Sequence, residues 1–198
     1  MLIVREKATE WNIDLENISV CGFSAGAHLS ALLGVHWNSD LLKEKFKVES
    51  KIFKPKTIIL GYPVIDYMVI KELDIKSKDK MSIELFKVSN EAVFGERNPS
   101  DELRKELSIS CNITRDMPPT FIWHTANDEL VYAKNSLNLV IALAEKNIQY
   151  ELHIFENGPH GMSLCNEVTA SESSQINLEC EVWFELAIKW LKNINKDK

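Results

Sequence analysis

A chain of 198 residues with 45% hydrophobic and 26% charged side chains has the composition of one globular domain, which we take to span residues 1–198. Its net charge of −6 argues against a nucleic-acid-binding surface, and no apolar run is long enough to cross a membrane. No leader segment opens the chain, and its Cys and His residues do not stand at metal-ligand spacing. We therefore expect a cytoplasmic protein with reduced thiols, no metal and no nucleic-acid or membrane partner.

The predicted elements alternate between helices and strands from the start of the chain. Residues 1–11 have the pattern of a helix, and the apolar run 18–21 is typical of a buried strand in which Cys21 would fill the core. An Ala- and Leu-rich helix comes next. A polar connection with one helical piece near 41–46 then leads to a second buried strand, 57–61.

Residues 64–115 form the least regular part of the sequence. Helical pieces are expected near 82–89 and 101–107. The charge run 71–80 is interpreted as a solvated face without a function of its own.

Regular alternation returns in the last third of the chain. A strand over 120–124 precedes a helix over 131–146, with Leu137 and Ile141 among its apolar positions. A further strand over 149–155 and an amphipathic helix over 178–191 complete the pattern. Strands that alternate with helices predict an α/β fold, with about four visible strands in a parallel sheet covered on both faces.

The sequence Gly22-Phe23-Ser24-Ala25-Gly26 stands between the first predicted strand and its helix. A Gly-x-Ser-x-Gly in that context is typical of a nucleophile elbow, in which a sharp turn exposes the serine above the sheet. Side chains at Gly22 or Gly26 are expected to collide with the tightly folded strand and helix. The alternative is a glycine-flanked turn with an idle serine, which the strand-before and helix-after context disfavours.

Two loops at the carboxyl ends of later strands carry further polar groups. Asp128 follows strand 120–124, and His160 follows strand 149–155 between two glycines. An imidazole titrates near neutral pH, at about 6.5, and suits a general base for Ser24, while Asp128 would orient its ring. The backbone N–H of Ala25 would donate to an oxyanion.

Each of these residues has competitors in the sequence. Asp66, after the second strand, is an alternative to Asp128, since some hydrolases shift the acid by one strand. Glu129 is expected to point to solvent. A structural role is favoured for the remaining histidines, His28, His36, His124 and His153.

Four segments carry a family resemblance, namely residues 21–26, 118–125, Asp128 and 155–161. They resemble the esterase/lipase branch of the α/β-hydrolases, and within it bacterial carboxylesterases similar to acetyl-xylan and feruloyl esterases. The resemblance runs from about residue 8 to 191. It implies an α/β-hydrolase fold and a cofactor-free serine ester hydrolase for short acyl esters, including acetyl groups on carbohydrates. The family's nucleophile, acid and base fall on Ser24, Asp128 and His160.

The sequence departs from this family in two places. Ala27 stands where the family has a further glycine, and the His-Gly-Gly loop and earlier strands that precede the family's elbow are not seen. The chain therefore resembles the C-terminal portion of the family's domain. We expect strand 18–21 to be an unpaired apolar edge that favours a homodimer. An inactive fragment that acts as a binding module, and a thioesterase or serine peptidase with the same triad, are the alternative functions.

Overall fold

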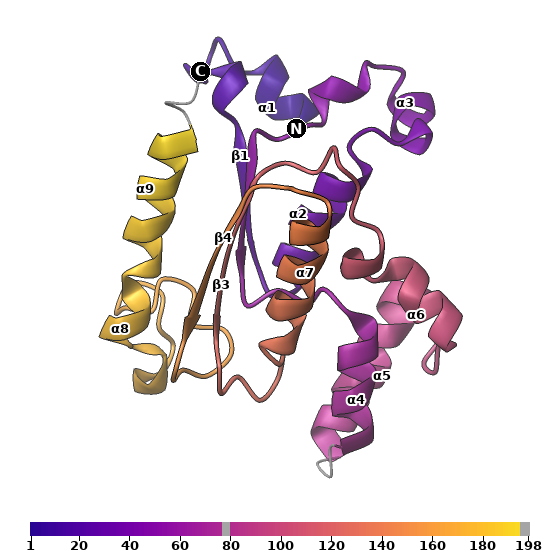
Figure 1. Cartoon of the computed structure of the whole chain (residues 1–198), viewed down its shortest axis with the longest axis vertical. Coiled ribbons are helices and arrows are strands. Elements are labelled where there is room, and N and C mark those ends of the chain that lie inside the picture. The colour runs from indigo at the N-terminus through magenta and orange to yellow at the C-terminus, as the bar shows by residue number, and fades with distance from the viewer. Residues whose placement is uncertain (77–79, 195–198) are drawn as a thin grey trace.

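The computed structural model describes residues 1–76 and 80–194. Within them, four parallel strands form one sheet in the order β1-β2-β3-β4, as Figure 1 shows. Because all four strands are parallel, their carboxyl ends meet at one edge, and the predicted parallel sheet is confirmed. The strands are β1 (Ser19–Phe23), β2 (Thr57–Gly61), β3 (Thr120–Thr125) and β4 (Tyr150–Phe155).

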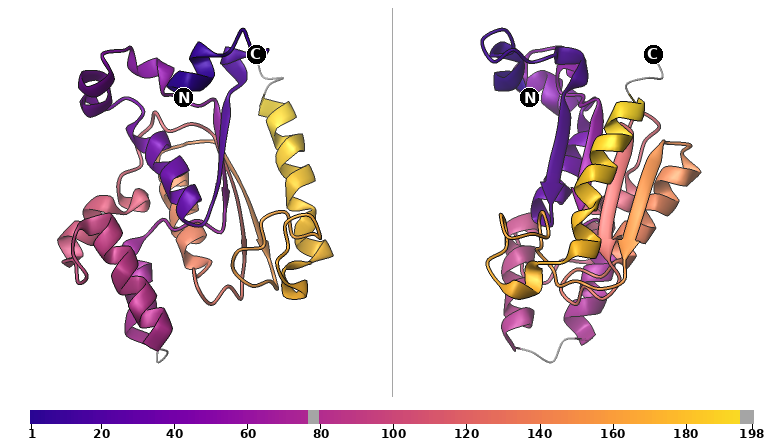
Figure 2. Two further views of the ribbon diagram at one scale, coloured as in Figure 1. Left: turned by 180° about the vertical axis from the view of Figure 1, so that it is seen from behind. Right: turned by 90° about the vertical axis from the view of Figure 1, so that its left-hand side faces the viewer.

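Helices cover both faces of this sheet (Figures 1 and 2). Helices α2 and α7 pack on one face and α9 on the other, while α4, α5 and α6 form a group on the side of the amino-terminal end of α2. The described α-helices are α1 (Leu2–Glu6), α2 (Ala25–His36), α3 (Asp40–Phe46), α4 (Tyr67–Lys76), α5 (Lys80–Phe94), α6 (Asp101–Leu107), α7 (Lys134–Glu145), α8 (Leu178–Glu181) and α9 (Trp183–Ile194). None of those described is both long and apolar enough to cross a membrane.

The two central strands are buried on both faces, which explains the apolar run in the middle of each. Ile58 and Leu60 of β2 belong to the core beneath α2 and α7, whereas Ile59 between them belongs to the core beneath α9. Successive strand residues point to opposite faces, so the middle of a strand covered on both sides is apolar on both faces. Trp123 of β3 stacks on Trp183 of α9 at 5.1 Å between ring centroids.

The edge strand β1 corrects one prediction. Within the described residues it pairs with β2 alone, as expected, but the side chain of Cys21 is exposed instead of filling the core. A strand at the edge of the sheet is only partly covered, so an apolar sequence does not guarantee burial there. All four cysteines are free thiols.

The first predicted helix is much shorter than expected. Helix α1 ends at Glu6, and the chain continues in turns that leave Trp11 51% exposed. Met1 makes no side-chain capping hydrogen bond, and Ala8 is the one buried residue among positions 1–11. Without capping or packing, a short helix is not stable enough to extend.

The helices in the last third of the chain differ from their predictions in which residues they bury and where they end. Helix α7 buries Leu139 and Leu143, whereas Leu137 and Ile141 are 47% and 58% exposed, so the predicted apolar side was wrong at these last two positions. The predicted helix 178–191 is divided at Val182 into α8 and α9.

Helix α4 was not predicted. The charge run 71–80 lies partly on α4, and residues 77–79 of it fall outside the described residues. Elsewhere in this segment the short helix over 101–107 was predicted with its correct bounds, and the piece near 82–89 is the middle of α5.

Candidate active site

The turn between β1 and α2 holds Ser24 in a strained conformation. Its backbone has φ 52° and ψ −119°, a region that costs a non-glycine residue about 1–3 kcal/mol. The neighbouring strand fixes this geometry, because the Ser24 N–H donates to the carbonyl of Gly61 at 3.0 Å. The predicted strand–turn–helix arrangement around Ser24 is therefore present, and the hydroxyl lies at the carboxyl edge of the sheet.

The two glycines beside Ser24 are not equivalent. A Cβ at Gly22 would lie 2.2 Å from the carbonyl oxygen of Gly26 and 2.5 Å from Ser30 Oγ, so only glycine fits there. At Gly26 no described atom lies within 4 Å of the corresponding position. The predicted collision at Gly26 was wrong, because this residue lies on the exposed first turn of α2.

His160 connects Ser24 to Asp128 through both of its ring nitrogens. Its Nε2 lies 2.8 Å from Ser24 Oγ, and its Nδ1 lies 2.7 Å from Asp128 Oδ2. A carboxylate can only accept, so the ring proton belongs on Nδ1 and the lone pair of Nε2 faces the serine hydroxyl. The structure thus brings together three predicted residues that are up to 136 positions apart in the sequence.

The Asp128 carboxylate is buried and surrounded by donors. Its Oδ1 accepts from the backbone N–H groups of Leu130 at 3.0 Å and Val131 at 2.9 Å. Burial alone would raise the pKa of Asp128, but hydrogen bonds from His124 and His160, together with the Val131 N–H, hold it well below its usual value. Asp128 is therefore ionised wherever the imidazole of His160 can act as a base.

The aromatic ring of Tyr62 forms a wall of the site that sequence reasoning missed. It contacts the His160 imidazole edge-on, with 4.8 Å between ring centroids, and its hydroxyl accepts a hydrogen bond from the N–H of Ser163. Burial raises the pKa of Tyr62 to about 12, so the phenol stays neutral. Its position directly after β2, at the carboxyl edge, is the signal that could have identified it.

The loop that carries His160 is bonded to the loop that carries Asp128. The N–H of Gly158 donates to Asn127 Oδ1 and the hydroxyl of Thr125 donates to the Gly158 carbonyl, both at 2.8 Å. Gly161, after the histidine, has φ +88°, a left-handed conformation that favours glycine. These bonds fix the approach of His160 to Asp128.

Ala25 opens helix α2, and its side chain is exposed. The first N–H groups of a helix have no acceptor inside the helix, so the Ala25 N–H is available to an anion beside Ser24. This geometry is what an oxyanion donor requires.

The competing acids do not reach His160. The Asp66 carboxylate accepts hydrogen bonds from the N–H of Met68 at 2.9 Å and from Asn138 Nδ2 at 2.7 Å. Glu129 is exposed, as predicted.

The other histidines differ in their surroundings. His28 is buried and hydrogen-bonded to Val64 O and the Tyr67 hydroxyl, which confirms its structural role. His36 is exposed at the end of α2, and His153 bonds to Glu151 on β4. His124 has a further contact that the sequence did not predict, with its Nε2 3.3 Å from Asp128 Oδ2.

A cavity of about 380 Å³ opens beside Ser24. Its walls come from α2, α4, α5 and the loops after β2 and β3, and they are mainly hydrocarbon. The polar groups of His28 and Tyr67 in this wall bond to each other at 3.2 Å, which leaves the surface apolar. The most prominent apolar lining residues are Leu29, Val64, Ile70, Leu85, Phe86 and Val93.

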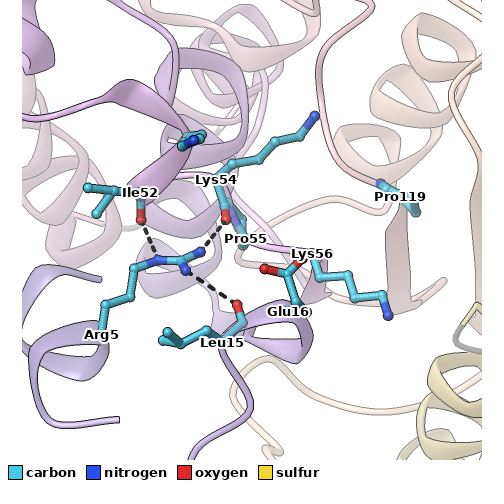
Figure 3. A pocket seen from close by; sticks show the side chains of 9 residues that line it. Arg5, Leu15, Glu16, Ile52, Lys54, Pro55, Lys56 and Pro119 are labelled. Carbon is cyan, nitrogen blue, oxygen red and sulfur yellow. Dashed lines mark hydrogen bonds between the residues drawn. The ribbon is translucent and has the colours of Figure 1, made fainter.

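A larger cavity, of about 500 Å³, lies at the opposite, amino end of the strands and is shown in Figure 3. The guanidinium of Arg5 dominates it, but its N–H groups donate to the carbonyls of Ile52, Lys54 and Leu15 at 2.7–3.3 Å. These donors are used to hold loops together, so this cavity has the character of a structural junction.

The parallel sheet, the strained serine turn and the hydrogen bonds from Ser24 through His160 to Asp128 together define an α/β hydrolase. Comparison with known proteins then identifies the family. The chain belongs to the BD-FAE family, whose model matches residues 2–143.

Named relatives of this chain are esterases and glycoside-degrading enzymes. It is 30% identical over 164 residues to endo-1,4-beta-xylanase B of Butyrivibrio fibrisolvens, covering 83% of this chain and 23% of that protein. It is 26% identical to an acetylxylan esterase of Xylanibacter ruminicola, covering 80% and 28%. The crystal structure of an acetyl ester-xyloside bifunctional hydrolase from Caldicellulosiruptor lactoaceticus matches with a TM-score of 0.72 and 34% identity, covering 98% of this chain and 62% of that one. The matched part of this chain thus corresponds to about a quarter of the length of the xylanase and of the acetylxylan esterase.

Proposed function

We propose that this chain carries the nucleophile, base and acid of a serine carboxylic-ester hydrolase. The observation that supports this most strongly is the continuous hydrogen-bond path from Ser24 through His160 to Asp128, with steps of 2.8 Å and 2.7 Å. Strain at Ser24 and burial of Asp128 add to it, since neither is needed for an idle serine turn.

The proposed reaction has two half-reactions. Ser24 Oγ attacks the ester carbonyl while His160 Nε2 takes its proton, and the Ala25 N–H donates to the oxyanion that forms. Asp128 stabilises the imidazolium through Nδ1. The proton then passes to the leaving alcohol, which departs and leaves an acyl group on Ser24. Water, activated by His160 in the same way, releases the acid, and no cofactor is required.

We propose that the apolar cavity beside Ser24 receives the acyl group. Its hydrocarbon walls suit the acyl part of a short ester, whereas a hydroxyl-rich sugar would leave polar groups without partners there. The names of the acetylxylan esterase and the acetyl ester-xyloside hydrolase favour acetyl groups on carbohydrates as substrates. A sugar alcohol would then face the open side of the site.

The exposed edge of β1 supports a second part of the proposal. Within the described residues this strand pairs on one side only, so its free backbone groups can pair with a second copy of the chain. We propose a homodimer through this edge, which light scattering of the purified chain would detect as a doubled mass.

The experiment that tests the proposed function compares the wild type with Ser24→Ala in hydrolysis of p-nitrophenyl acetate. We expect the variant to lose activity by several orders of magnitude, on the order of 10⁶-fold as in a well-studied triad. Ser50→Ala is the matched control, because the Ser50 hydroxyl bonds to Asn38 and Ser50 does not line this cavity. A wild type with no activity would favour the non-catalytic binding module, and an active Ser24→Ala would exclude this serine as nucleophile.

A further inference from the structure

The acid of the site contacts two histidines instead of one. Asp128 Oδ2 lies 2.7 Å from Nδ1 of His160 and 3.3 Å from Nε2 of His124. His124 is the penultimate residue of β3 and is fully buried, with no exposed side-chain surface. The second contact therefore comes from a strand of the sheet itself.

The bonding partners of His124 fix where its proton lies. Nε2 is 2.7 Å from the carbonyl oxygen of Val131, which can only accept, so Nε2 carries the hydrogen. Nδ1 then accepts from the hydroxyl of Ser136, at 2.8 Å. The Nε2–H therefore faces two acceptors together, the shorter bond to the Val131 carbonyl and a longer one to the Asp128 carboxylate.

We propose that His124 is a positioning residue for ester hydrolysis, whose Nε2–H holds Asp128 Oδ2 in the orientation that receives the Nδ1–H of His160. This inference rests on the proposed function of Ser24, His160 and Asp128. It assigns a role in the reaction to a histidine that would otherwise only fill the core.

The donor count around Asp128 supports this role. Oδ1 receives two backbone N–H groups, and Oδ2 receives two imidazole N–H groups, so each oxygen has two donors. Because these four donors are fixed in a buried place, the Asp128 carboxylate has one orientation in which it accepts a hydrogen bond from each of them. Without His124, Oδ2 would keep a single donor, and the carboxylate could turn away from the line between His160 and Ser24.

The second donor also affects the charge that His160 experiences. A hydrogen bond from His124 withdraws part of the negative charge of Oδ2, so less of it is available to stabilise the imidazolium. Removing this donor should make the imidazolium more stable and shift the acid limb of the kcat/KM profile to higher pH. Among the described residues, Tyr62 also faces Asp128 and His160, and burial raises its pKa to about 12, while Glu129 is exposed.

The test uses the full chain with p-nitrophenyl acetate between about pH 5 and 9. We expect His124→Phe to lower kcat by roughly 10- to 100-fold, the loss of one hydrogen bond to a charged group, with little change in KM. Its acid limb should move upward by about half a pH unit or more. His124→Gln, whose side-chain amide can donate to the same oxygen, should recover most of kcat and the wild-type limb.

Two further variants keep the test decisive. His153→Gln is the matched control, because His153 also bonds to a carboxylate but lies on β4 away from Ser24, and it should behave as wild type. If His124→Phe does not fold, Ser136→Ala provides the test. This variant removes the hydrogen bond to Nδ1 of His124 but keeps the imidazole. Its kcat should fall about tenfold, and its acid limb should shift in the same direction. A folded His124→Phe or Ser136→Ala with unchanged kcat and acid limb would overturn the role of His124. An inactive wild type would instead overturn the proposed function.

Discussion

Each end of the sheet carries a cavity, yet the two cavities differ in what the polar side chains beside them do. At the amino end, the N–H groups of Arg5 donate to three backbone carbonyls, and the larger cavity surrounds a charge that is already satisfied. At the carboxyl end, the hydroxyl of Ser24 and the imidazole of His160 meet beside a smaller apolar cavity. Convergence of reactive groups, rather than cavity size, therefore distinguishes a candidate active site from a structural junction.

Among substitutions that test this difference between the two ends, we expect the largest loss of activity at Asp128. Asp128→Asn should lower kcat by roughly 10⁴-fold, because an amide at this position favours the wrong tautomer of His160. The measurement is p-nitrophenyl acetate hydrolysis, with the fold checked by circular dichroism. Asp66→Asn is the matched control, since Asp66 bonds to Met68 and Asn138. A severe loss in Asp66→Asn with a mild one in Asp128→Asn would move the acid to Asp66.

A substitution at the amino end should affect stability instead of turnover. Arg5→Ala removes hydrogen bonds from a cation to three carbonyls and should lower the free energy of unfolding by about 2 kcal/mol. Esterase activity of the folded variant should stay at the wild-type value. Urea unfolding and steady-state kinetics measure the two quantities. A variant as stable as wild type but with reduced kcat would break the distinction between the two cavities.

Two groups at the carboxyl end, Asp128 and Tyr62, should make the stability of the chain depend on pH. We expect this effect to be smaller than that of Arg5→Ala. The pKa of Asp128 is lowered in the folded chain, so its stabilising contribution is present above about pH 4 and is lost as pH falls through the folded-state value. The pKa of Tyr62 is raised to about 12, so its contribution is present below about pH 10 and is lost as pH rises through about 12.

Urea unfolding of wild type and Asp128→Asn across about pH 2 to 7 measures the acid part. The difference in unfolding free energy between the two proteins should shrink below about pH 4, because the amide does not titrate. A difference that stays constant down to pH 2 would mean that the folded chain does not hold Asp128 ionised more strongly than the unfolded chain.

Local sequence signals were sufficient for the elements that depend on local chemistry. Residues 58–60 are all apolar because both faces of the strand are covered, and the predicted bounds 57–61 are those of β2. The turn at Ser24 was predicted because Gly22 must be glycine for strand and helix to approach so closely. The chain order of serine, acid and base placed the three residues on successive loops at one sheet edge.

Features set by contacts between distant segments were not predicted. Strand β1 was expected at the edge of the sheet, but the exposure of Cys21 was not predicted, because burial depends on which other segments cover the strand. Residues 131–133 precede α7, which begins at Lys134. The contacts of Tyr62 with His160 and of His124 with Asp128 join different loops and strands, so no pattern within one segment reveals them.

The most direct test of the central claim is covalent labelling with a fluorophosphonate, followed by mass spectrometry of the digested protein. The account predicts a single adduct on Ser24, slowed by orders of magnitude in His160→Gln, because the hydroxyl reacts only when a base removes its proton. Ser50→Ala, outside the cavity, should be labelled at the wild-type rate. An adduct on another serine, or a rate independent of His160, would contradict the assignment of Ser24 as an activated nucleophile.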